Sequence, residues 1–150
     1  MIFLLDTDSI IFLARGLKTT QRRLQSRQKA EIIMEHCRNA RAAGNLVGLS
    51  AVTVSELEFG AHNSDSYETE MSAVRKVLTP FEVYDYDAIH CPAHYGKIRH
   101  ALEKQGQPIG SMDLLIAAHA LALDATLVTN NESHFRRVAG LRVVNWLKGI

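Results

Sequence analysis

Residues 2–9 read Ile2-Phe3-Leu4-Leu5-Asp6-Thr7-Asp8-Ser9, an apolar run that ends at a carboxylate. Four more apolar runs of similar length follow along the chain, at residues 46–49, 81–84, 126–129 and 141–144. Short continuous apolar runs are typical of strands buried on both faces, and the stretches between them have helical periodicity. The alternation predicts an α/β domain with a mainly parallel, five-stranded sheet that helices cover on both faces.

Five helices are expected between these strands. Gly44, Gly106, Pro108 and Gly110 interrupt the helical periodicity and mark where helices end. The polar residues after Asp6 are suited to the start of a further helix. The five predicted helices lie near residues 27–43, 51–63, 67–78, 87–105 and 111–123.

Length and composition favour one globular domain. The 150 residues suit a single domain over residues 1–150, and 47% hydrophobic with 22% charged residues excludes a disordered or collagen-like chain. Cys37 and Cys91 lack metal-binding spacing and are expected to be reduced thiols, which predicts a cytoplasmic protein. The first apolar run has no basic residue before it and stops at Asp6, so neither a signal peptide nor a membrane span is expected.

Acidic residues at strand ends are the first candidates for chemistry, because ligands of open parallel sheets bind at the carboxyl ends of the strands. Asp6 directly follows the first strand, where its alternative role is to cap the next helix. Asp113 opens a helix that is apolar on nearly all sides, so we expect it to be buried. A buried carboxylate must be hydrogen-bonded, paired, protonated or bound to a metal, and helix capping meets only part of that need. His119, on the same helix, is expected to be a hydrogen-bonded core residue.

Glu56 follows the second strand on a predicted helix. Gly60, four residues later, lies on the same helix face and leaves room beside Glu56 for a metal ion or a substrate. Glu58 is on the same helix, and helix geometry alone does not separate the two acids. An exposed, solubilising helix face is the alternative for both.

Each of these three candidate acids, Asp6, Glu56 and Asp113, lies in a segment without Lys or Arg. Local ion pairs therefore cannot neutralise them, and two carboxylates about 4 Å apart repel by about 4 kcal/mol at an effective dielectric constant near 20. If the fold brings them together, they need a divalent cation or raised pKa values, and oxygen ligands favour Mg²⁺ or Mn²⁺ over zinc. The segments without basic residues are 1–14, 42–74 and 105–135.

Other polar and basic residues are candidates for contacts with a charged ligand. Thr129, Asn130 and Asn131 follow the fourth strand and can hydrogen-bond a metal-bound water, so Asn131 joins the predicted catalytic set, although these residues are also typical of a turn. Residues 15–41 carry eight basic residues against two acidic ones, which predicts either phosphate contacts or a solvated helix face. The candidates for phosphate contact are Arg22, Arg23, Arg136 and Arg137.

Four motifs occur in order over nearly the whole chain: Leu5-Asp6-Thr7-Asp8, Ser55-Glu56-Leu57 with Gly60, Gly110-Ser111-Met112-Asp113, and Leu127-Val128-Thr129-Asn130-Asn131 with Phe135. Together they resemble the motifs of PIN-domain ribonucleases of the VapC toxin type. The resemblance implies one PIN-like, three-layer α/β/α domain that cleaves RNA, forms homodimers and is held inactive by a VapB-type antitoxin. It also implies that Asp6, Glu56 and Asp113 bind Mg²⁺ or Mn²⁺, and only this likeness selects Glu56 over Glu58.

One departure from the family pattern affects the predicted mechanism. Many relatives carry a further Asp where this chain has Asn130-Asn131, and a subset of VapC-like toxins also has Asn there. The missing charge favours one metal ion in the resting site, with another arriving with the substrate. The predicted reaction is phosphodiester hydrolysis by metal-activated water, which Glu56 orients or deprotonates, so products carry 5′-phosphate and 3′-hydroxyl ends. Because tRNA, rRNA and mRNA share this bond, the prediction stops at RNA as the substrate class.

Two other functions are alternatives. A haloacid dehalogenase-type phosphatase would use Asp6 as nucleophile and Asp8 as acid or base, but the later paired-acid motif of that family is missing. A catalytically silent PIN-like module would bind RNA or a protein without cleavage, and the presence of all three acids argues against it. A small upstream gene that encodes a DNA-binding repressor would support the toxin hypothesis.

Overall fold

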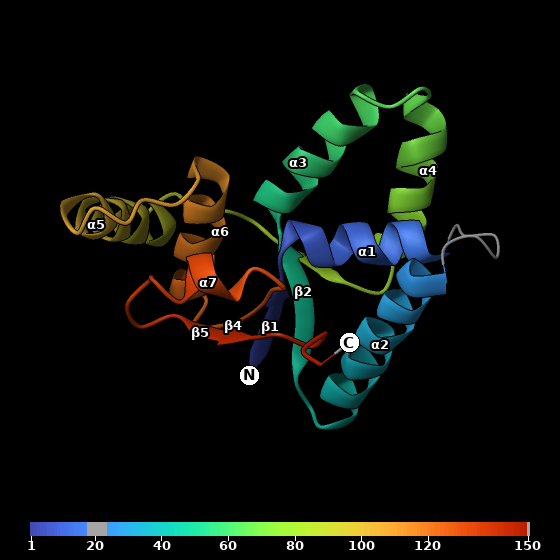
Figure 1. The fold of residues 1–150 in the computed structure, drawn as a ribbon, viewed down its shortest axis with the longest axis horizontal. Coiled ribbons are helices and arrows are strands. Elements are labelled where there is room, and N and C mark those ends of the chain that lie inside the picture. Colours follow the sequence, from blue (N-terminus) through green and yellow to red (C-terminus); the bar gives the residue numbers. More distant parts are fainter. Residues whose placement is uncertain (18–23, 150) are drawn as a thin grey trace.

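The structure is a computed structural model that describes residues 1–17 and 24–149. Its strands are β1 (Ile2–Leu5), β2 (Leu46–Ser50), β3 (Glu82–Tyr84), β4 (Thr126–Val128) and β5 (Arg142–Val144). Its helices are α1 (Thr7–Leu17), α2 (Leu24–Ala42), α3 (Ala51–His62), α4 (Tyr67–Leu78), α5 (His90–Lys104), α6 (Ser111–Ala122) and α7 (Glu132–Phe135). The strands form one sheet in the order β3-β2-β1-β4-β5, and every pairing is parallel (Figure 1).

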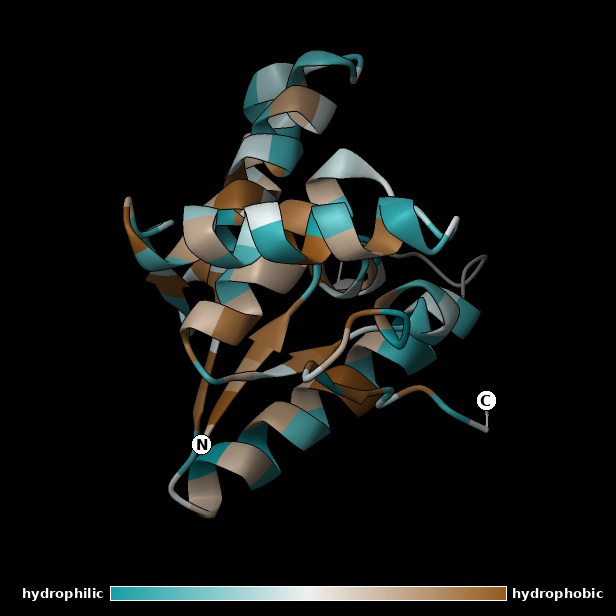
Figure 2. Cartoon of the chain, turned by 90° about the vertical axis from the view of Figure 1, so that its left-hand side faces the viewer, coloured by the Kyte–Doolittle hydropathy of each residue, from teal (hydrophilic) through white to brown (hydrophobic). Residues whose placement is uncertain are grey.

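Successive residues of the central strands face two separate hydrophobic layers, because side chains alternate across a sheet. Leu5, whose partners in the sheet are Leu49 and Val128, packs in the layer that α1, α2 and α4 cover. Leu4 and Leu127 point to the opposite layer, which α5 and α6 cover. Figure 2 shows the strands as a largely hydrophobic centre, whereas hydrophilic and hydrophobic residues alternate along the outer helices. The predicted α/β/α architecture with a parallel sheet is confirmed.

The parallel strands bring their carboxyl ends to one edge of the sheet. Asp6 follows β1, α3 begins directly after β2, and Thr129 follows β4. In Figure 1, β1 and β2 run upward from the side of the N-terminus, and α1 and α3 start near their upper ends. This edge therefore collects side chains that are far apart in the sequence, as expected for an open parallel sheet.

The helix predictions differ from the structure in four places, the first of which is α2, which begins at Leu24 rather than near residue 27. Helix α5 begins at His90 rather than at residue 87, because the Asp87 carboxylate accepts the backbone N–H groups of Ile89 and His90 and holds a turn. Helix α1, of which only the start was predicted, extends to Leu17 and so into the basic segment of residues 15–41. Helix α7 is a single turn within the stretch that was expected to be a polar strand tip or a turn.

Three further expectations concern residues away from the sheet edge. Cys37 and Cys91 are free and buried, and burial raises the pKa of the Cys37 thiol to about 11. Within the described residues, no helix has both the length and the apolar character that a membrane span requires. Arg22 and Arg23, two of the candidates for phosphate contact, lie outside the described residues.

Candidate active site

Asp6 is the buried acid of the strand edge, with 4% of its surface exposed. Its Oδ1 accepts the backbone N–H of Ser9 at 2.9 Å, and its Oδ2 accepts the hydroxyl of Thr129 at 2.5 Å. Asp6 thus does cap α1, as its alternative role predicted. Burial nevertheless raises the pKa of Asp6 from 3.8 to about 6, although both hydrogen bonds lower it. The two hydrogen bonds therefore compensate only part of the desolvation of its charge.

A hydrogen bond from α1 holds Glu56 near the end of β1. The Thr7 hydroxyl, directly after Asp6, donates to Glu56 Oε1 at 2.5 Å. Because that proton is used, the contact of 3.1 Å between the Thr7 and Thr53 hydroxyls is donated by Thr53. Glu58 instead accepts the Tyr67 hydroxyl of α4 at 2.6 Å. The structure therefore distinguishes Glu56 from Glu58, which helix geometry alone could not do.

Open space lies next to Glu56. Apart from its chain neighbours and the backbone of its own helix, no described atom approaches within 4 Å of the position that a Cβ would occupy on Gly60. Glu56 and Gly60 line a cavity of about 120 Å³ between α1, α3 and α4, and Arg15 of α1 lines the same cavity. The first residue of the basic segment therefore lies near the acid, on the side where Gly60 leaves room.

Asp113 is more exposed than the apolar helix suggested, and the expectation of burial was wrong. It lies in the first turn of α6, and 34% of its side chain is exposed, because the buried positions of the helix begin only at Leu114. The His134 ring nitrogen Nδ1 lies 3.8 Å from Asp113 Oδ2. Partial burial raises the pKa of Asp113, His134 lowers it, and the charge of Asp8 raises it further.

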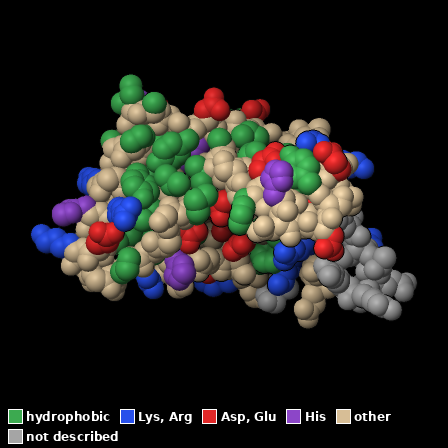
Figure 3. All heavy atoms as spheres, turned by 90° about the horizontal axis from the view of Figure 1, so that it is seen from above, with side chains coloured by type: hydrophobic (Ala, Val, Ile, Leu, Met, Phe, Trp, Pro, Cys, Tyr) green, Lys and Arg blue, Asp and Glu red, His purple; other side chains and the backbone are tan. Residues whose placement is uncertain are grey.

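Asp8 is a residue of this edge that the predicted site omitted. It lies exposed in the first turn of α1, and its negative charge raises the pKa values of both Asp6 and Asp113. Asp8 therefore acts through its charge on two acids that are 107 positions apart in the sequence. Its position two residues after Asp6, at the N-terminus of a helix, is the sequence signal that could have added Asp8 to the predicted site. Figure 3, seen from this end of the sheet, shows acidic side chains gathered in a central hollow.

The donor chemistry of this edge fits a hard divalent cation. Its acids offer only oxygen, and none of Asp6, Glu56 and Asp113 forms an ion pair with a Lys or Arg among the described residues. Asp6 in particular is a buried carboxylate with a raised pKa, which a bound cation would lower. In the part of the chain that the structure describes, no three His, Cys, Asp or Glu side chains already form a group that could hold a metal ion.

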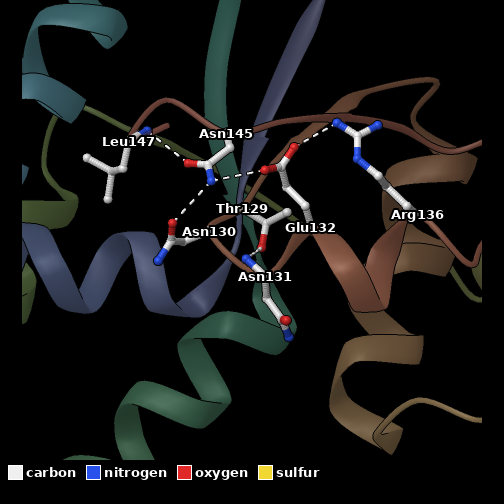
Figure 4. Close-up of polar contacts among 7 residues, drawn as sticks. All are labelled: Thr129, Asn130, Asn131, Glu132, Arg136, Asn145 and Leu147. Carbon is white, nitrogen blue, oxygen red and sulfur yellow. Dashed lines mark hydrogen bonds and ion pairs between the residues drawn. The ribbon is translucent and has the colours of Figure 1, made fainter. Parts of the chain in front are cut away.

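The loop after β4 is held in place by hydrogen bonds from β5 and its continuation. The Thr129 hydroxyl, which donates to Asp6, also accepts the backbone N–H of Asn131 at 2.9 Å. Asn145 Nδ2 donates to Asn130 Oδ1 at 3.1 Å and to Glu132 Oε2 at 3.2 Å (Figure 4). In that view Asn130 points toward Asn145, whereas the Asn131 side chain points away from it. The loop is therefore braced on one side and presents Asn131 on the other.

His134 and Asn145 are two residues of this region that the predicted site lacked. Asn131 Nδ2 lies 2.8 Å from His134 Nδ1, so His134 lies between Asn131 and Asp113. The basic candidates Arg136 and Arg137 both have partners within the chain. Arg136 forms an ion pair with Glu132 at 2.7 Å, and Arg137 donates a hydrogen bond to the Pro108 carbonyl at 3.2 Å.

These strands, helices and acids define a PIN domain, and the family model described as "PIN domain" matches residues 3–141. The chain is 36% identical to "Ribonuclease VapC1" of Haemophilus influenzae strain R2866, over 99% of this chain and 100% of that protein. It is 40% identical to "tRNA(fMet)-specific endonuclease VapC" of Shigella flexneri, over 65% of this chain and 74% of that protein. The crystal structure of VapBC2 from Rickettsia felis, bound to a promoter DNA fragment, matches with a TM-score of 0.84 and 32% identity, and covers 97% of this chain and 99% of that chain. The chain therefore belongs to the VapC branch of the PIN-domain family, which confirms the resemblance seen in the motifs.

Proposed function

We propose that this chain is a cytoplasmic, Mg²⁺- or Mn²⁺-dependent endoribonuclease, the toxin of a type II toxin–antitoxin system. The observation that carries the proposal is Asp6, a buried carboxylate with a pKa of about 6 and no Lys or Arg partner among the described residues. The names of the relatives support ribonuclease activity. Membership in the PIN-domain family leaves no support for the haloacid dehalogenase-type alternative.

Asp6, Asp113 and Glu56 would hold the cation. When bound, it neutralises the acids, polarises a phosphate oxygen and lowers the pKa of water. Glu56 Oε1 accepts the Thr7 hydroxyl, so Oε2 is the oxygen that takes the proton from the attacking water. Thr129 orients Asp6, and Asn131 offers its side-chain carbonyl to water or substrate, because its amide nitrogen faces His134.

The test is cleavage of a structured RNA by the purified, antitoxin-free protein. Transfer RNA is the first substrate to use, because one similar relative is named as specific for tRNA(fMet). We expect cleavage with Mg²⁺ or Mn²⁺, complete loss in EDTA, and products with 5′-phosphate and 3′-hydroxyl ends. Products with 2′,3′-cyclic phosphate ends would reject the proposed chemistry. Absence of cleavage with either ion would favour the silent RNA- or protein-binding module.

A VapB-type antitoxin is the proposed protein partner, and the toxin is proposed to act as a homodimer. The similar Rickettsia felis structure is a VapBC complex on promoter DNA, which supports a partner that also binds DNA. In the cleavage assay, adding the product of a small neighbouring gene should suppress the activity. A neighbouring product that binds the chain without suppressing cleavage would contradict the inhibitory role.

Replacing both Arg136 and Arg137 by Ala should weaken RNA binding more than it slows cleavage of bound RNA. These exposed arginines flank the loop of Asn131, and removing one arginine–phosphate interaction should reduce the salt slope by about 0.7 for single strands or 0.9 for duplexes. Arg99→Ala is the control, because Arg99 is also exposed and paired with a glutamate four residues away, but lies on α5. Binding measured in EDTA at several salt concentrations checks this, and an unchanged slope would remove both arginines from the RNA surface.

A further inference from the structure

A buried hydrogen bond joins the two helices that carry Glu56 and Asp113. Ser50 and His119 are both fully buried, and the Ser50 hydroxyl oxygen lies 2.6 Å from His119 Nδ1. Ser50 ends β2 and is the N-cap of α3, where its oxygen accepts the Val52 N–H at 3.0 Å. His119 lies on α6. The hydrogen bond therefore links the start of the Glu56 helix to the helix that Asp113 opens.

The direction of this hydrogen bond follows from its neighbours. The Ser50 oxygen already accepts the Val52 N–H, and its single proton has no other acceptor among the described residues, so it donates to His119 Nδ1. His119 is then neutral with its proton on Nε2, and burial lowers its pKa, which also favours the neutral form. The ring is packed edge-on against Tyr86, with ring centroids 5.6 Å apart. The tautomer of His119 is thereby fixed.

Packing alone does not call for a histidine in this position. Nε2 of His119 is buried and has no partner at full hydrogen-bond geometry among the described residues; the Asp85 backbone and the charges of Asp85 and Asp87 raise the His119 pKa but do not offset its burial, so this N–H group is at best weakly satisfied. An apolar side chain would fill the same layer without that cost. The expectation of a fully hydrogen-bonded core histidine is thus met at one ring nitrogen only. The property that an apolar side chain cannot supply is the acceptor toward Ser50.

We propose that Ser50 and His119 are a positioning pair that sets the separation of α3 and α6, and hence of Glu56 and Asp113. Helices α3 and α6 pack against each other, and no other side-chain hydrogen bond joins α6 to β2 or α3 within the described residues. Glu56 is fixed from the other side by Thr7, next to Asp6. The pair thus places the Asp113 helix relative to Glu56, which the Thr7 hydroxyl holds from α1. This inference rests on the proposed function, because it concerns the width of the proposed cation site.

The experiment compares His119→Leu with His119→Asn, two side chains of similar size of which only Asn keeps an acceptor near the position of Nδ1. Mn²⁺ binding is measured from the electron paramagnetic resonance signal of the free ion, without RNA. We expect His119→Leu to bind Mn²⁺ at least about 10-fold more weakly, as for residues that orient metal ligands, and His119→Asn to stay closer to the wild type. Thermal unfolding should show His119→Leu to be folded, and the wild-type ¹⁵N NMR spectrum should show His119 protonated at Nε2.

If His119→Leu does not fold, Ser50→Ala decides the question, with Ser66→Ala as its control. Both substitutions remove a helix N-cap, but Ser66 caps α4, which carries none of the three acids. We expect weaker Mn²⁺ binding only for Ser50→Ala. Equal Mn²⁺ affinity of the wild type and the tested variant would overturn the positioning pair and leave the proposed function intact. A wild type that binds no Mn²⁺ would overturn both.

Discussion

Asp6→Asn is expected to abolish RNA cleavage and at the same time make the metal-free protein more stable. The carboxylate is buried and its pKa is raised from 3.8 to about 6, which corresponds to about 3 kcal/mol of lost stability at neutral pH. Asn removes this charge and still offers an oxygen to the Ser9 N–H, as a common N-cap residue does, but its amide nitrogen cannot accept the Thr129 hydroxyl, which costs about 1 kcal/mol. A chain of this size gains about 2 to 4 °C per kcal/mol, so a rise in Tm of about 4 °C or more is expected.

The pH dependence gives this prediction its sign. The pKa of Asp6 is higher in the folded than in the unfolded state, so the folded state binds the proton more tightly. Its favourable contribution is present below about pH 4 and is lost as the pH rises through about 6. The difference in Tm between Asp6→Asn and the wild type should therefore be small at pH 4 and fully developed at pH 7. Thermal unfolding in EDTA at a series of pH values measures it.

Exposed Asp65 supplies the control for Asp6→Asn. Asp65→Asn should leave both cleavage and the pH profile of Tm unchanged, because this side chain lies on the surface. Adding Mn²⁺ at about 1,000 times its Kd should reverse the order of stability, since a ligand at that concentration stabilises by about 4.1 kcal/mol, more than the charge of Asp6 costs, and Asp6→Asn lacks a ligand for the ion. If Asp6→Asn is less stable than the wild type at pH 7 in EDTA, the charge of Asp6 does not destabilise the folded state.

The strands were predictable because their signal is local. Leu4 and Leu5 face opposite hydrophobic layers, so both must be apolar, and such a run can be recognised without knowledge of its neighbours. The start of α5 was less predictable, because it depends on which backbone groups the Asp87 side chain accepts. Helix α7 has only four residues, which is too short for helical periodicity to appear.

The candidate site also has a part that local sequence predicts and a part that depends on the assembled fold. Asp6 could be placed at the sheet edge because it directly follows an apolar run. Its partner Thr129 lies 123 residues away, and Thr7 reaches Glu56 across 49 residues, so these hydrogen bonds depend on the assembled fold. The burial of Asp113 was overestimated because apolar helix composition does not tell that the buried positions of α6 begin only at Leu114. Resemblance to a family supplied the choice of Glu56, and the Thr7 hydrogen bond supplies a physical reason for it.

Glu56→Gln should lower the rate of RNA cleavage by about 10² to 10⁴, whereas Glu58→Gln should leave it nearly unchanged. Positioned general bases contribute factors of this size, and an amide in place of Glu56 cannot take a proton from water. Glu58 holds the Tyr67 hydroxyl where α3 meets α4, away from Thr7 and Asp6. Single-turnover cleavage at saturating metal measures the step itself, so weaker metal binding does not enter the comparison.

The pair of glutamates also tests whether helix α3 presents the correct face. The two residues lie on one helix two positions apart, so a change in the stability of α3 should affect both variants similarly. Equal loss of activity in both variants, with equal loss in Tm, would mean that α3 is merely weakened. A greater loss for Glu58→Gln would place the reacting face of α3 toward α4, which is incompatible with the Thr7 hydrogen bond as a part of the site. Loss confined to Glu56→Gln, with Tm retained, would identify Glu56 as the proton acceptor and place the reacting face of α3 toward α1, where Thr7 holds this side chain.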